Sequence, residues 1–331
     1  MRRHLLLFLG LISILPGQSR NTLPVKRPSG SAERTFDIDN AVTTRGSTAS
    51  GATGSAVIRA QILLDRAGFS VGEIDGRMGS NSVRAVEGFR AARGLPAGDS
   101  LDEAAWMALH QDTAPVLVEY TVTAADVNGP FTTVPQDMMR KAKLKSLDFS
   151  SALEGLSEKF HASPAVMRQL NPRGRFTAAG EKIMAPNVRT QTAAKASRVV
   201  VSKSKSTVTV LDSNGKVLAQ YPCTSGSEYD PLPIGEWQIT GVFRNPKFNY
   251  NPKLFWDASP KDSSATIAAG PNNPVGVVWI DLSKEHYGIH GTPLPGQVGH
   301  AESHGCIRLT NWDAAELAGM VEKGIPVSLT E

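Results

Sequence analysis

Residues 303–309 read SHGCIRL, and residues 289–291 upstream of them read IHG. Together they place a thiol, Cys306, near two imidazoles, His290 and His304. An imidazole that accepts the proton of a thiol leaves a thiolate, which attacks carbonyl carbon. Gly305 lacks a Cβ, so its backbone can approach a substrate closely and direct amide groups at it. The stretch therefore predicts a cysteine nucleophile held in a backbone turn.

The residues after this stretch predict a helix over 311–323, with Thr310 or Asn311 as its N-cap and Gly324 just past its end. Backbone N–H groups at the start of a helix favour negative charge, and so does a cation such as Arg308. Both features favour a thiolate and the oxyanion that forms when a thiolate attacks a carbonyl.

Upstream of the stretch, the pattern is that of β-strands. Short runs rich in valine, isoleucine and threonine are separated by turn residues, and DSNG at residues 212–215 is typical of a hairpin turn. The C-terminal third is therefore expected to be mainly β, with one helix. The predicted strands cover residues 199–201, 207–211, 217–221, 237–242 and 275–282.

This part of the chain, residues 198–331, resembles the YkuD-type L,D-transpeptidase catalytic domain. The resemblance rests on IHG and SHGCIR, on DPLPIGEWQI at residues 230–239 and on GPNNPVGVVWIDL at residues 270–282. The family signature is a histidine, a spacer and then Ser/Thr-His-Gly-Cys, and residues 291–302 form the spacer here. The resemblance implies a β-sandwich with a C-terminal helix, and an acyltransferase that acts on peptidoglycan.

The resemblance also implies a role for each residue of the motif. Cys306 is the nucleophile, which attacks the carbonyl of the third residue of a donor stem peptide, releases the terminal D-alanine and holds a thioester. His290 is the general base, oriented by a backbone carbonyl near Gly291. His304 shares proton transfer or shapes an oxyanion hole with the amides of Gly305 and Cys306.

Further expectations concern the substrates and partners. Arg308 is expected to hold a substrate carboxylate, and Ser303 to orient the loop. Tyr287 and Trp279 are expected to line the donor channel. An amine acceptor then gives a 3→3 cross-link or attachment to an outer-membrane protein, whereas water gives L,D-carboxypeptidase activity. Carbapenems are expected to acylate Cys306. The sequence implies no metal, nucleotide or organic cofactor, because it has no P-loop or dinucleotide glycine fingerprint.

Residues 55–112 resemble the three-helix peptidoglycan-binding domain. The resemblance rests on AGF at residues 67–69, on G-x-x-D-G-x-x-G at residues 72–79, on the AVxxF run at residues 85–89 and on Trp106. Apolar residues at helical spacing predict helices over 56–67, 80–93 and 101–109. Arg90 departs from the pattern, because the family usually has glutamine there.

Residues 116–188 predict a strand, two helices and a second strand. The strands fall at 118–122 and 181–186, and the helices at 151–160 and 163–170. This order, with LNP at residues 170–172, resembles a small α+β glycan-binding module of the LysM type. An insertion from about residue 125 to 150 departs from that module, so the alternative is a structural spacer.

The first residues predict the compartment. The chain starts with basic residues, continues with a short apolar run at residues 5–15 and then has small residues at the expected cleavage site. This pattern predicts a secretory signal peptide, and the alternative is an uncleaved membrane anchor. A Ser/Thr/Gly-rich tether follows. The protein is therefore expected to be exported, periplasmic and associated with the cell wall. The predicted multidomain order is signal peptide 1–19, disordered tether 20–54, peptidoglycan-binding domain 55–112, LysM-like module 116–188, linker 189–197 and catalytic domain 198–331.

Composition excludes several other classes of protein. The 331 residues carry 35 basic and 31 acidic side chains, for a net charge of +4, and only 6% are aromatic, so a dedicated nucleic-acid binder is excluded. Two cysteines exclude a disulfide framework. Cys223 is expected to be a buried free thiol, and a redox pair with Cys306 is the alternative.

Two rival functions remain open. His286 and His290 are four residues apart, as are His300 and His304, with Glu302 between them, so a zinc hydrolase is one rival. The glycines and prolines of this region argue against the helix that such spacing needs. The other rival is a non-catalytic wall-binding protein, which the intact cysteine motif argues against.

Overall fold

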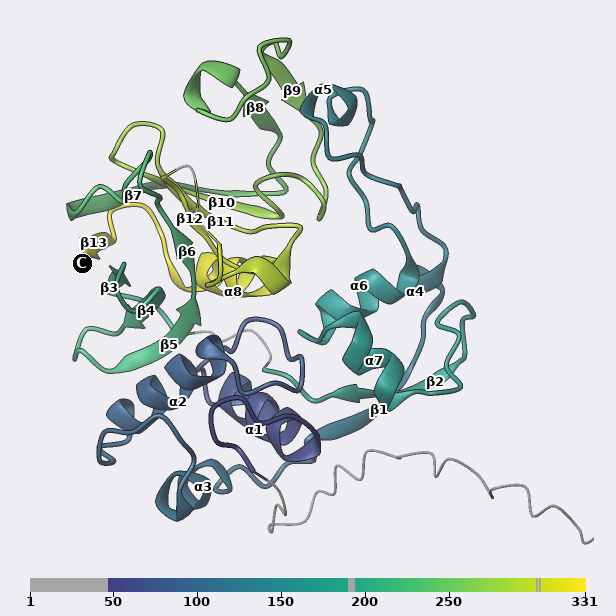
Figure 1. Cartoon of the computed structure of the whole chain (residues 1–331), viewed down its shortest axis with the longest axis vertical. Coiled ribbons are helices and arrows are strands. Elements are labelled where there is room, and N and C mark those ends of the chain that lie inside the picture. Colours follow the sequence, from purple (N-terminus) through teal and green to yellow (C-terminus); the bar gives the residue numbers. More distant parts are fainter. Residues whose placement is uncertain (1–46, 190–193, 302, 304) are drawn as a thin grey trace, which may run out of the picture. The chain divides into compact units, whose positions relative to one another are not determined.

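The computed structural model describes residues 47–189, 194–301, 303 and 305–331 (Figure 1). The predicted signal peptide, residues 20–46 of the predicted tether, residues 190–193 of the predicted linker, and Glu302 and His304 lie outside the described residues. Among the described helices, none has the length and apolar character needed to cross a membrane.

Three helices follow residue 54, as the apolar spacing predicts. They are α1 (Ser55–Arg66), α2 (Ser80–Ala92) and α3 (Glu103–Leu109). α3 begins later than predicted because Asp102 caps it, and the Asp102 carboxylate accepts the backbone N–H of Ala105 at 2.9 Å.

Two side chains hold the connections between these helices. Gln61 of α1 donates to Asp75 Oδ1 at 2.9 Å and accepts the N–H of Gly76 at 2.8 Å, which fixes the glycine-rich loop. Arg90, the departure from the family pattern, is buried and donates to the Pro96 carbonyl at 2.7 Å. Its guanidinium also donates to the Asp102 carboxylate at 3.0 Å, so Arg90 ties α2 to the start of α3.

The middle segment has the predicted strand–helix–helix–strand order. Its two strands pair antiparallel, with Leu117 opposite Pro186. The insertion between the first strand and the helix pair contains two further short helices. The elements are β1 (Leu117–Thr121), α4 (Ala124–Val127), α5 (Met138–Lys141), α6 (Ala152–Lys159), α7 (Pro164–Leu170) and β2 (Lys182–Pro186).

The three-helix and middle segments share one hydrophobic core. Phe89 of α2 and Met167 of α7 belong to the same cluster of buried side chains. The backbones are also joined, because the N–H of Ile74 donates to the carbonyl of His161 at 2.8 Å. The Ile74 carbonyl in turn accepts the N–H of Ser163 at 3.0 Å. The two segments are therefore packed together over the described residues.

The C-terminal segment is mainly β, as predicted. Its strands form a nine-stranded sheet in the order β5-β4-β3-β13-β7-β10-β11-β12-β6. The long strand β7 joins the β5-β4-β3-β13 part of this sheet to the β10-β11-β12-β6 part. Its first residues pair with β13, and its later residues pair with β10. The strands are β3 (Arg198–Ser202), β4 (Thr207–Leu211), β5 (Val217–Pro222), β6 (Thr224–Ser225), β7 (Gly235–Arg244), β10 (Val278–Leu282), β11 (Gly288–His290), β12 (Ile307–Arg308) and β13 (Pro326–Thr330).

Helix α8 (Asn311–Met320) lies against this sheet (Figure 1) and is shorter than predicted. Thr310 is its N-cap, and the Thr310 hydroxyl accepts a backbone N–H of the first turn. The helix ends before Val321, which is extended and buried in the core. Gly324 is therefore not the residue that ends the helix, and its N–H instead donates to the Ile239 carbonyl at 2.8 Å. The predicted end of this helix at residue 323 is wrong.

The insertion of the middle segment packs on a hairpin of the C-terminal segment. The hairpin consists of β8 (Phe248–Tyr250) and β9 (Ala265–Ile267), and fully buried Leu147 joins both strands in a small core. The N–H of Leu147 donates to the Ala269 carbonyl at 3.0 Å, and its carbonyl accepts the N–H of Asn272 at 2.9 Å. Two short 3₁₀ turns complete this segment, η1 (Pro252–Leu254) and η2 (Pro295–Gln297).

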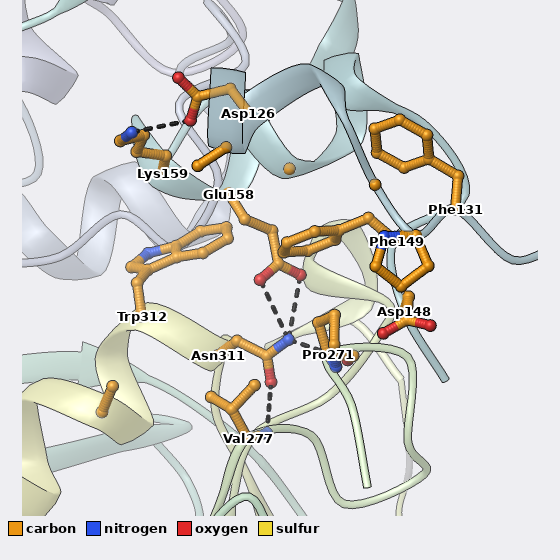
Figure 2. A pocket seen from close by; sticks show the side chains of 15 residues that line it. Asp126, Phe131, Asp148, Phe149, Glu158, Lys159, Pro271, Val277, Asn311 and Trp312 are labelled. Atoms are coloured by element: carbon orange, nitrogen blue, oxygen red, sulfur yellow. Dashed lines mark hydrogen bonds and ion pairs between the residues drawn. The ribbon is translucent and has the colours of Figure 1, made fainter. Parts of the chain in front are cut away.

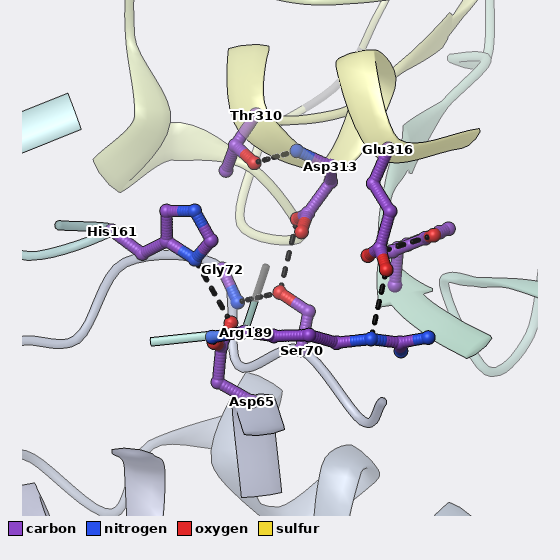
Figure 3. A network of polar contacts seen from close by, with 9 residues as sticks. Asp65, Ser70, Gly72, His161, Arg189, Thr310, Asp313 and Glu316 are labelled. Carbon is purple, nitrogen blue, oxygen red and sulfur yellow. Dashed lines mark hydrogen bonds and ion pairs between the residues drawn. The ribbon is translucent and has the colours of Figure 1, made fainter. Parts of the chain in front are cut away.

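A buried polar network joins α8 to the other two segments (Figure 3). Ser70 donates its hydroxyl proton to Asp313 Oδ2 at 3.0 Å, and burial raises the pKa of Asp313 to about 8. His161 Nδ1 lies 3.1 Å from Asp65 Oδ1. Burial opposes the charge of His161, but the Asp65 carboxylate outweighs that effect and raises the pKa of His161. The network therefore holds polar side chains from all three segments together.

Candidate active site

Two short parallel strands bring the predicted catalytic residues together. β11 and β12 pair with Ile289 opposite Ile307 and His290 opposite Arg308. Both isoleucines are fully buried in the core. Because side chains alternate along a strand, His290, Arg308 and the preceding Cys306 lie toward the opposite face. The pairing thus places His290 and Arg308 opposite each other, with Cys306 directly before β12.

His290 is held in one orientation and one tautomer. Its Nδ1 lies 2.6 Å from the carbonyl of Gly291, so Nδ1 carries the proton and donates it, and Nε2 keeps a free lone pair. The ring stacks on Trp279 with 5.5 Å between centroids and 19° between planes. Burial lowers the pKa of His290 to about 4, and the charge of Arg308 acts in the same direction. The imidazole is therefore neutral at physiological pH and able to act as a base.

Cys306, the residue directly before β12, carries a free and half-buried thiol. Burial raises the pKa of its thiol, whereas a hydrogen bond from the Gly288 backbone and the charge of Arg308 oppose that rise. Its Sγ donates to the carbonyl of His286 at 3.6 Å. At rest Cys306 is therefore a neutral thiol and His290 a neutral imidazole, so proton transfer must accompany attack.

The loop that carries Cys306 is held by two hydrogen bonds of Ser303 and by the close packing of Gly305 on Tyr287. The Ser303 hydroxyl accepts the N–H of Gly226 at 2.7 Å and donates to the Cys306 carbonyl at 2.6 Å. Gly305 has φ +90, a region that favours glycine, and a Cβ there would lie 2.8 Å from the ring of Tyr287. His304, between these residues, lies outside the described part of the chain.

The remaining predicted substrate residues surround this loop. Tyr287 packs on Gly305, and burial raises the pKa of Tyr287. Trp279 covers the face of His290, and its indole N–H donates to Asp281 Oδ1 at 3.1 Å. Arg308 is half-buried, and burial lowers the pKa of its guanidinium.

The other two described histidines of the motif region have exposed side chains, although the backbone carbonyl of His286 accepts from Cys306 Sγ. His286 and His300 are exposed, and His300 Nδ1 lies 3.4 Å from Ser80 Oγ of α2. Within the described residues, no group of three histidine, cysteine or acidic side chains is arranged to hold a metal ion.

The spacer between His290 and Ser303 is held by the helical segment and by β6. Asn81 of α2 donates from Nδ2 to the Val298 carbonyl at 2.8 Å. The N–H of Gly299 donates to the Thr224 hydroxyl at 2.9 Å. The predicted peptidoglycan-binding segment therefore contacts the loop that joins the two halves of the catalytic motif.

Asn311 is a positioning residue that the sequence indicated only as a helix cap (Figure 2). Its Oδ1 accepts the N–H of Val277 at 3.2 Å, and its Nδ2 donates to the Glu158 carboxylate at 3.0 and 3.1 Å. A Cβ on Gly291 would lie 2.3 Å from Asn311 Oδ1, so the amide leaves no room for a side chain at Gly291, whose carbonyl orients His290. The one sequence signal was a polar side chain at the predicted start of this helix.

Asp230 was also missed. It lies in the DPLPIGEW motif, and its negative charge acts to raise the pKa of both Tyr287 and Cys306. Its Oδ2 is buried with no hydrogen-bond partner among the described residues. The sequence marked this residue as part of a family motif without indicating that its charge acts on the thiol.

Replacing Arg308 with glutamine is expected to raise the pKa of Cys306, because the guanidinium charge stabilises the thiolate. The measurement is the rate of iodoacetamide alkylation against pH, in a Cys223→Ala background that leaves one thiol. The midpoint should move to higher pH in Arg308→Gln and return toward the parent value in Arg308→Lys. Equal midpoints in all three proteins would contradict this role of the charge.

Two family models match the chain. The L,D-transpeptidase catalytic domain matches residues 196–329, and a peptidoglycan binding domain matches residues 53–109. The chain is 32% identical over 180 residues to a Bacillus licheniformis protein named L,D-transpeptidase YkuD, a match that covers 54% of this chain and 93% of the relative. It is also 32% identical over 178 residues to L,D-transpeptidase YkuD of Bacillus subtilis, covering 54% of this chain and 92% of the relative.

Shorter and more distant likenesses also exist. The chain is 37% identical over 67 residues to L,D-transpeptidase YbiS of Escherichia coli, a match covering 20% of this chain and 22% of the relative. A solved L,D-transpeptidase from Mycobacterium smegmatis aligns with a TM-score of 0.33 and 22% identity, over 46% of this chain and 65% of that one. The catalytic-domain match and the near-complete coverage of the Bacillus relatives lead to one conclusion: the chain belongs to the YkuD family of L,D-transpeptidases.

Proposed function

We propose that Cys306 is the nucleophile and His290 the general base of L,D-transpeptidation in this protein. The observation that carries the proposal is the β11–β12 pairing, together with the hydrogen bond from His290 Nδ1 to the Gly291 carbonyl. Nε2 of the neutral imidazole accepts the thiol proton as Sγ bonds to the carbonyl carbon of the third stem residue. The intermediate then breaks its C–N bond, the terminal D-alanine leaves with that proton, and a thioester remains.

The second half of the reaction restores the enzyme. An acceptor amine attacks the thioester carbonyl and gives a proton to His290, and the C–S bond breaks. The thiolate of Cys306 then takes that proton back from the imidazole. With an amine acceptor the product is a 3→3 cross-link or a stem attached to an outer-membrane protein, and with water it is a tripeptide.

The neighbouring residues receive supporting roles in this proposal. The amides of Gly305 and Cys306, with His304, stabilise the oxyanion. Ser303 keeps the loop in place through its two hydrogen bonds. Arg308 holds a carboxylate of the stem peptide and favours the thiolate. Tyr287 and Trp279 form walls beside the thiol and the imidazole.

The remaining segments direct the enzyme to its polymer. The peptidoglycan-binding domain, proposed to span residues 55–112, raises the local concentration of an insoluble substrate around the catalytic domain at 198–331. The middle segment, 116–188, is proposed to be a LysM-like module, supported by its strand–helix–helix–strand order and its antiparallel strand pair. A signal peptide at 1–19, a tether to residue 54 and a linker at 189–197 complete a protein exported to the periplasm.

The proposed activity is tested with purified protein and a disaccharide-tetrapeptide, with products identified by mass spectrometry. Release of D-alanine with a cross-linked dimer indicates transpeptidation, and release with a tripeptide indicates carboxypeptidase activity. A second incubation with EDTA tests the zinc rival. No release of D-alanine, or release that EDTA abolishes and iodoacetamide does not, would overturn the proposal.

A carbapenem is expected to form a covalent adduct on Cys306, because a thiolate opens the strained β-lactam amide as it opens a stem peptide. The intact-protein mass should rise by the mass of the whole inhibitor, since ring opening releases no fragment. The adduct should be absent from Cys306→Ala and present in Cys223→Ala. An adduct that persists in Cys306→Ala would assign the acylation to another residue.

A further inference from the structure

His290 lies in a row of side chains that crosses three strands of the sheet. The strand registers place Trp279 of β10 opposite His290 of β11, and His290 opposite Arg308 of β12. Residues directly opposite on neighbouring strands share one face of a sheet, so their side chains are neighbours. The imidazole is therefore flanked by an indole on one side and a guanidinium on the other.

Trp279 covers one face of the imidazole. The two rings are stacked, with 5.5 Å between centroids and 19° between planes. The indole can lie close to β11 because that strand has a glycine there: a Cβ on Gly288 would lie 2.5 Å from the indole ring. His290 is only 4% exposed. A stacked indole keeps water from the ring face that it covers, so Trp279 contributes to this burial.

Asp281, two residues further along β10, holds the indole in this position. Its Oδ1 accepts the indole N–H of Trp279 at 3.1 Å, and that N–H can only donate. Its Oδ2 accepts the hydroxyl proton of Thr240 of β7 at 2.7 Å, so a neighbouring strand fixes the carboxylate in turn. Residues two apart on a strand share a face of the sheet. The half-buried carboxylate of Asp281 therefore sets the rotation of the indole on the face that carries His290.

We propose that Asp281 is a positioning residue for the general base: it anchors the indole of Trp279, and the anchored indole holds the imidazole of His290 and shields it from water. The inference rests on the proposed function, since it explains how the base of that reaction is held. The Gly291 carbonyl fixes the imidazole within its plane, through Nδ1, and the stacked indole fixes it perpendicular to that plane. The two contacts together determine where Nε2 points.

The shielding has a measurable effect on the basicity of His290. Burial lowers the pKa of His290 to about 4, and the charge of Arg308 acts in the same direction. The other titratable groups that β10, β11 and β12 and the residues beside them place around this row are Asp281, Tyr287 and Cys306. If the anchor is lost, the indole can turn away and water can reach the imidazole, which raises the pKa of His290.

The sign of the change separates positioning from a direct charge effect. A nearby carboxylate favours the imidazolium, so the loss of the Asp281 charge alone would lower the pKa of His290. Hydration of the imidazole acts in the opposite direction. A rise in the pKa of His290 after removal of Asp281 therefore reports the loss of the anchor.

The test follows the imidazole of His290 by NMR in the full-length protein as pH is varied. The chain has seven histidines, and the spectrum of His290→Gln identifies the signal of His290. In Asp281→Ala, the pKa of His290 should rise from about 4 toward the ordinary value of 6.5. Asparagine keeps an oxygen for the indole N–H, and its amide can donate to the hydroxyl of Thr240. Asp281→Asn should therefore titrate at or below the parent value.

Further variants assign the effect to the indole. Trp279→Ala removes the cover and should raise the pKa of His290 by itself. Adding Asp281→Ala to Trp279→Ala should then cause no further rise, because Asp281 acts through that ring. Trp279→Phe keeps an aromatic ring but lacks the N–H, so it tests the anchor with Asp281 in place and should also raise the pKa of His290. Glu322→Ala removes an exposed carboxylate after α8 and should leave the titration unchanged.

The result that overturns the inference is a pKa of His290 that stays the same or falls in both Asp281→Ala and Trp279→Phe, in proteins that still unfold cooperatively. A full further rise in the Trp279→Ala background, or a rise in Asp281→Asn equal to that in Asp281→Ala, overturns it as well. The titration needs no substrate, so it tests the anchor even if the parent protein releases no D-alanine. That failure would count against the proposed function and not against the anchor.

Discussion

Replacing Cys306 with alanine is expected to abolish D-alanine release, with a fall of at least about a thousandfold in kcat, because no other described group can carry the acyl chain. Cys223 is the matched control. It is fully buried, and burial raises the pKa of its thiol to about 12, so it is an inert thiol at neutral pH. Cys223→Ala should therefore keep nearly full activity.

The same pair of variants separates catalysis from wall binding. Cys306→Ala should still sediment with isolated sacculi, since the peptidoglycan-binding segment is unchanged. Both cysteines are free in the structure, in agreement with the expectation for Cys223. Activity retained in Cys306→Ala, or lost in Cys223→Ala with the fold intact, would contradict the assignment of the nucleophile.

Replacing His290 with glutamine is expected to lower kcat about 100- to 10,000-fold, the usual contribution of a general base. A second variant, His290→Asn, places an amide nitrogen where the ring has Nδ1 and can still donate to the Gly291 carbonyl, so in that variant the loop should keep its conformation. Thermal unfolding near that of the parent protein would support this. The loss would then belong to proton transfer and not to folding.

The pH dependence of the parent enzyme gives a second test of His290. Its pKa is lowered to about 4, so the imidazole is neutral and competent above that value and becomes protonated below it. The acid limb of kcat/KM should therefore lie near pH 4 instead of near 6.5, the ordinary value for histidine. An acid limb near 6.5 would indicate that the base is a solvated histidine.

Much of the candidate site could be predicted from the sequence, because covalent chemistry needs particular residue types. A thiol, an imidazole and a glycine turn at characteristic spacing are a local signal, and Cys306 does directly precede β12, the strand that pairs with the one that ends at His290. The three helices of the first segment were predicted for a similar reason, since their apolar spacing is local. Even Arg90, a departure from the family pattern, keeps a buried bridging position.

The positioning residues could not be predicted in this way. Asn311 is satisfied by Glu158, which lies 153 positions away in the chain, and by peptides of two other loops. A polar side chain does not reveal its distant partner from its own neighbourhood. The end of α8 was missed for a related reason, because the core draws Val321 into an extended conformation that the local pattern does not indicate.

The sequence by itself determined the chemistry of the protein and the nature of its first and last segments. It did so because a nucleophile motif and helical periodicity are properties of short stretches. Only the tertiary structure decided which parts of the C-terminal segment the middle segment contacts. Its insertion packs on the β8–β9 hairpin, its helix α6 supplies Glu158 to Asn311, and its aromatic rings border a cavity beside α8. These relations depend on contacts between distant segments, which burial and hydrogen bonding fix only once the chain is folded.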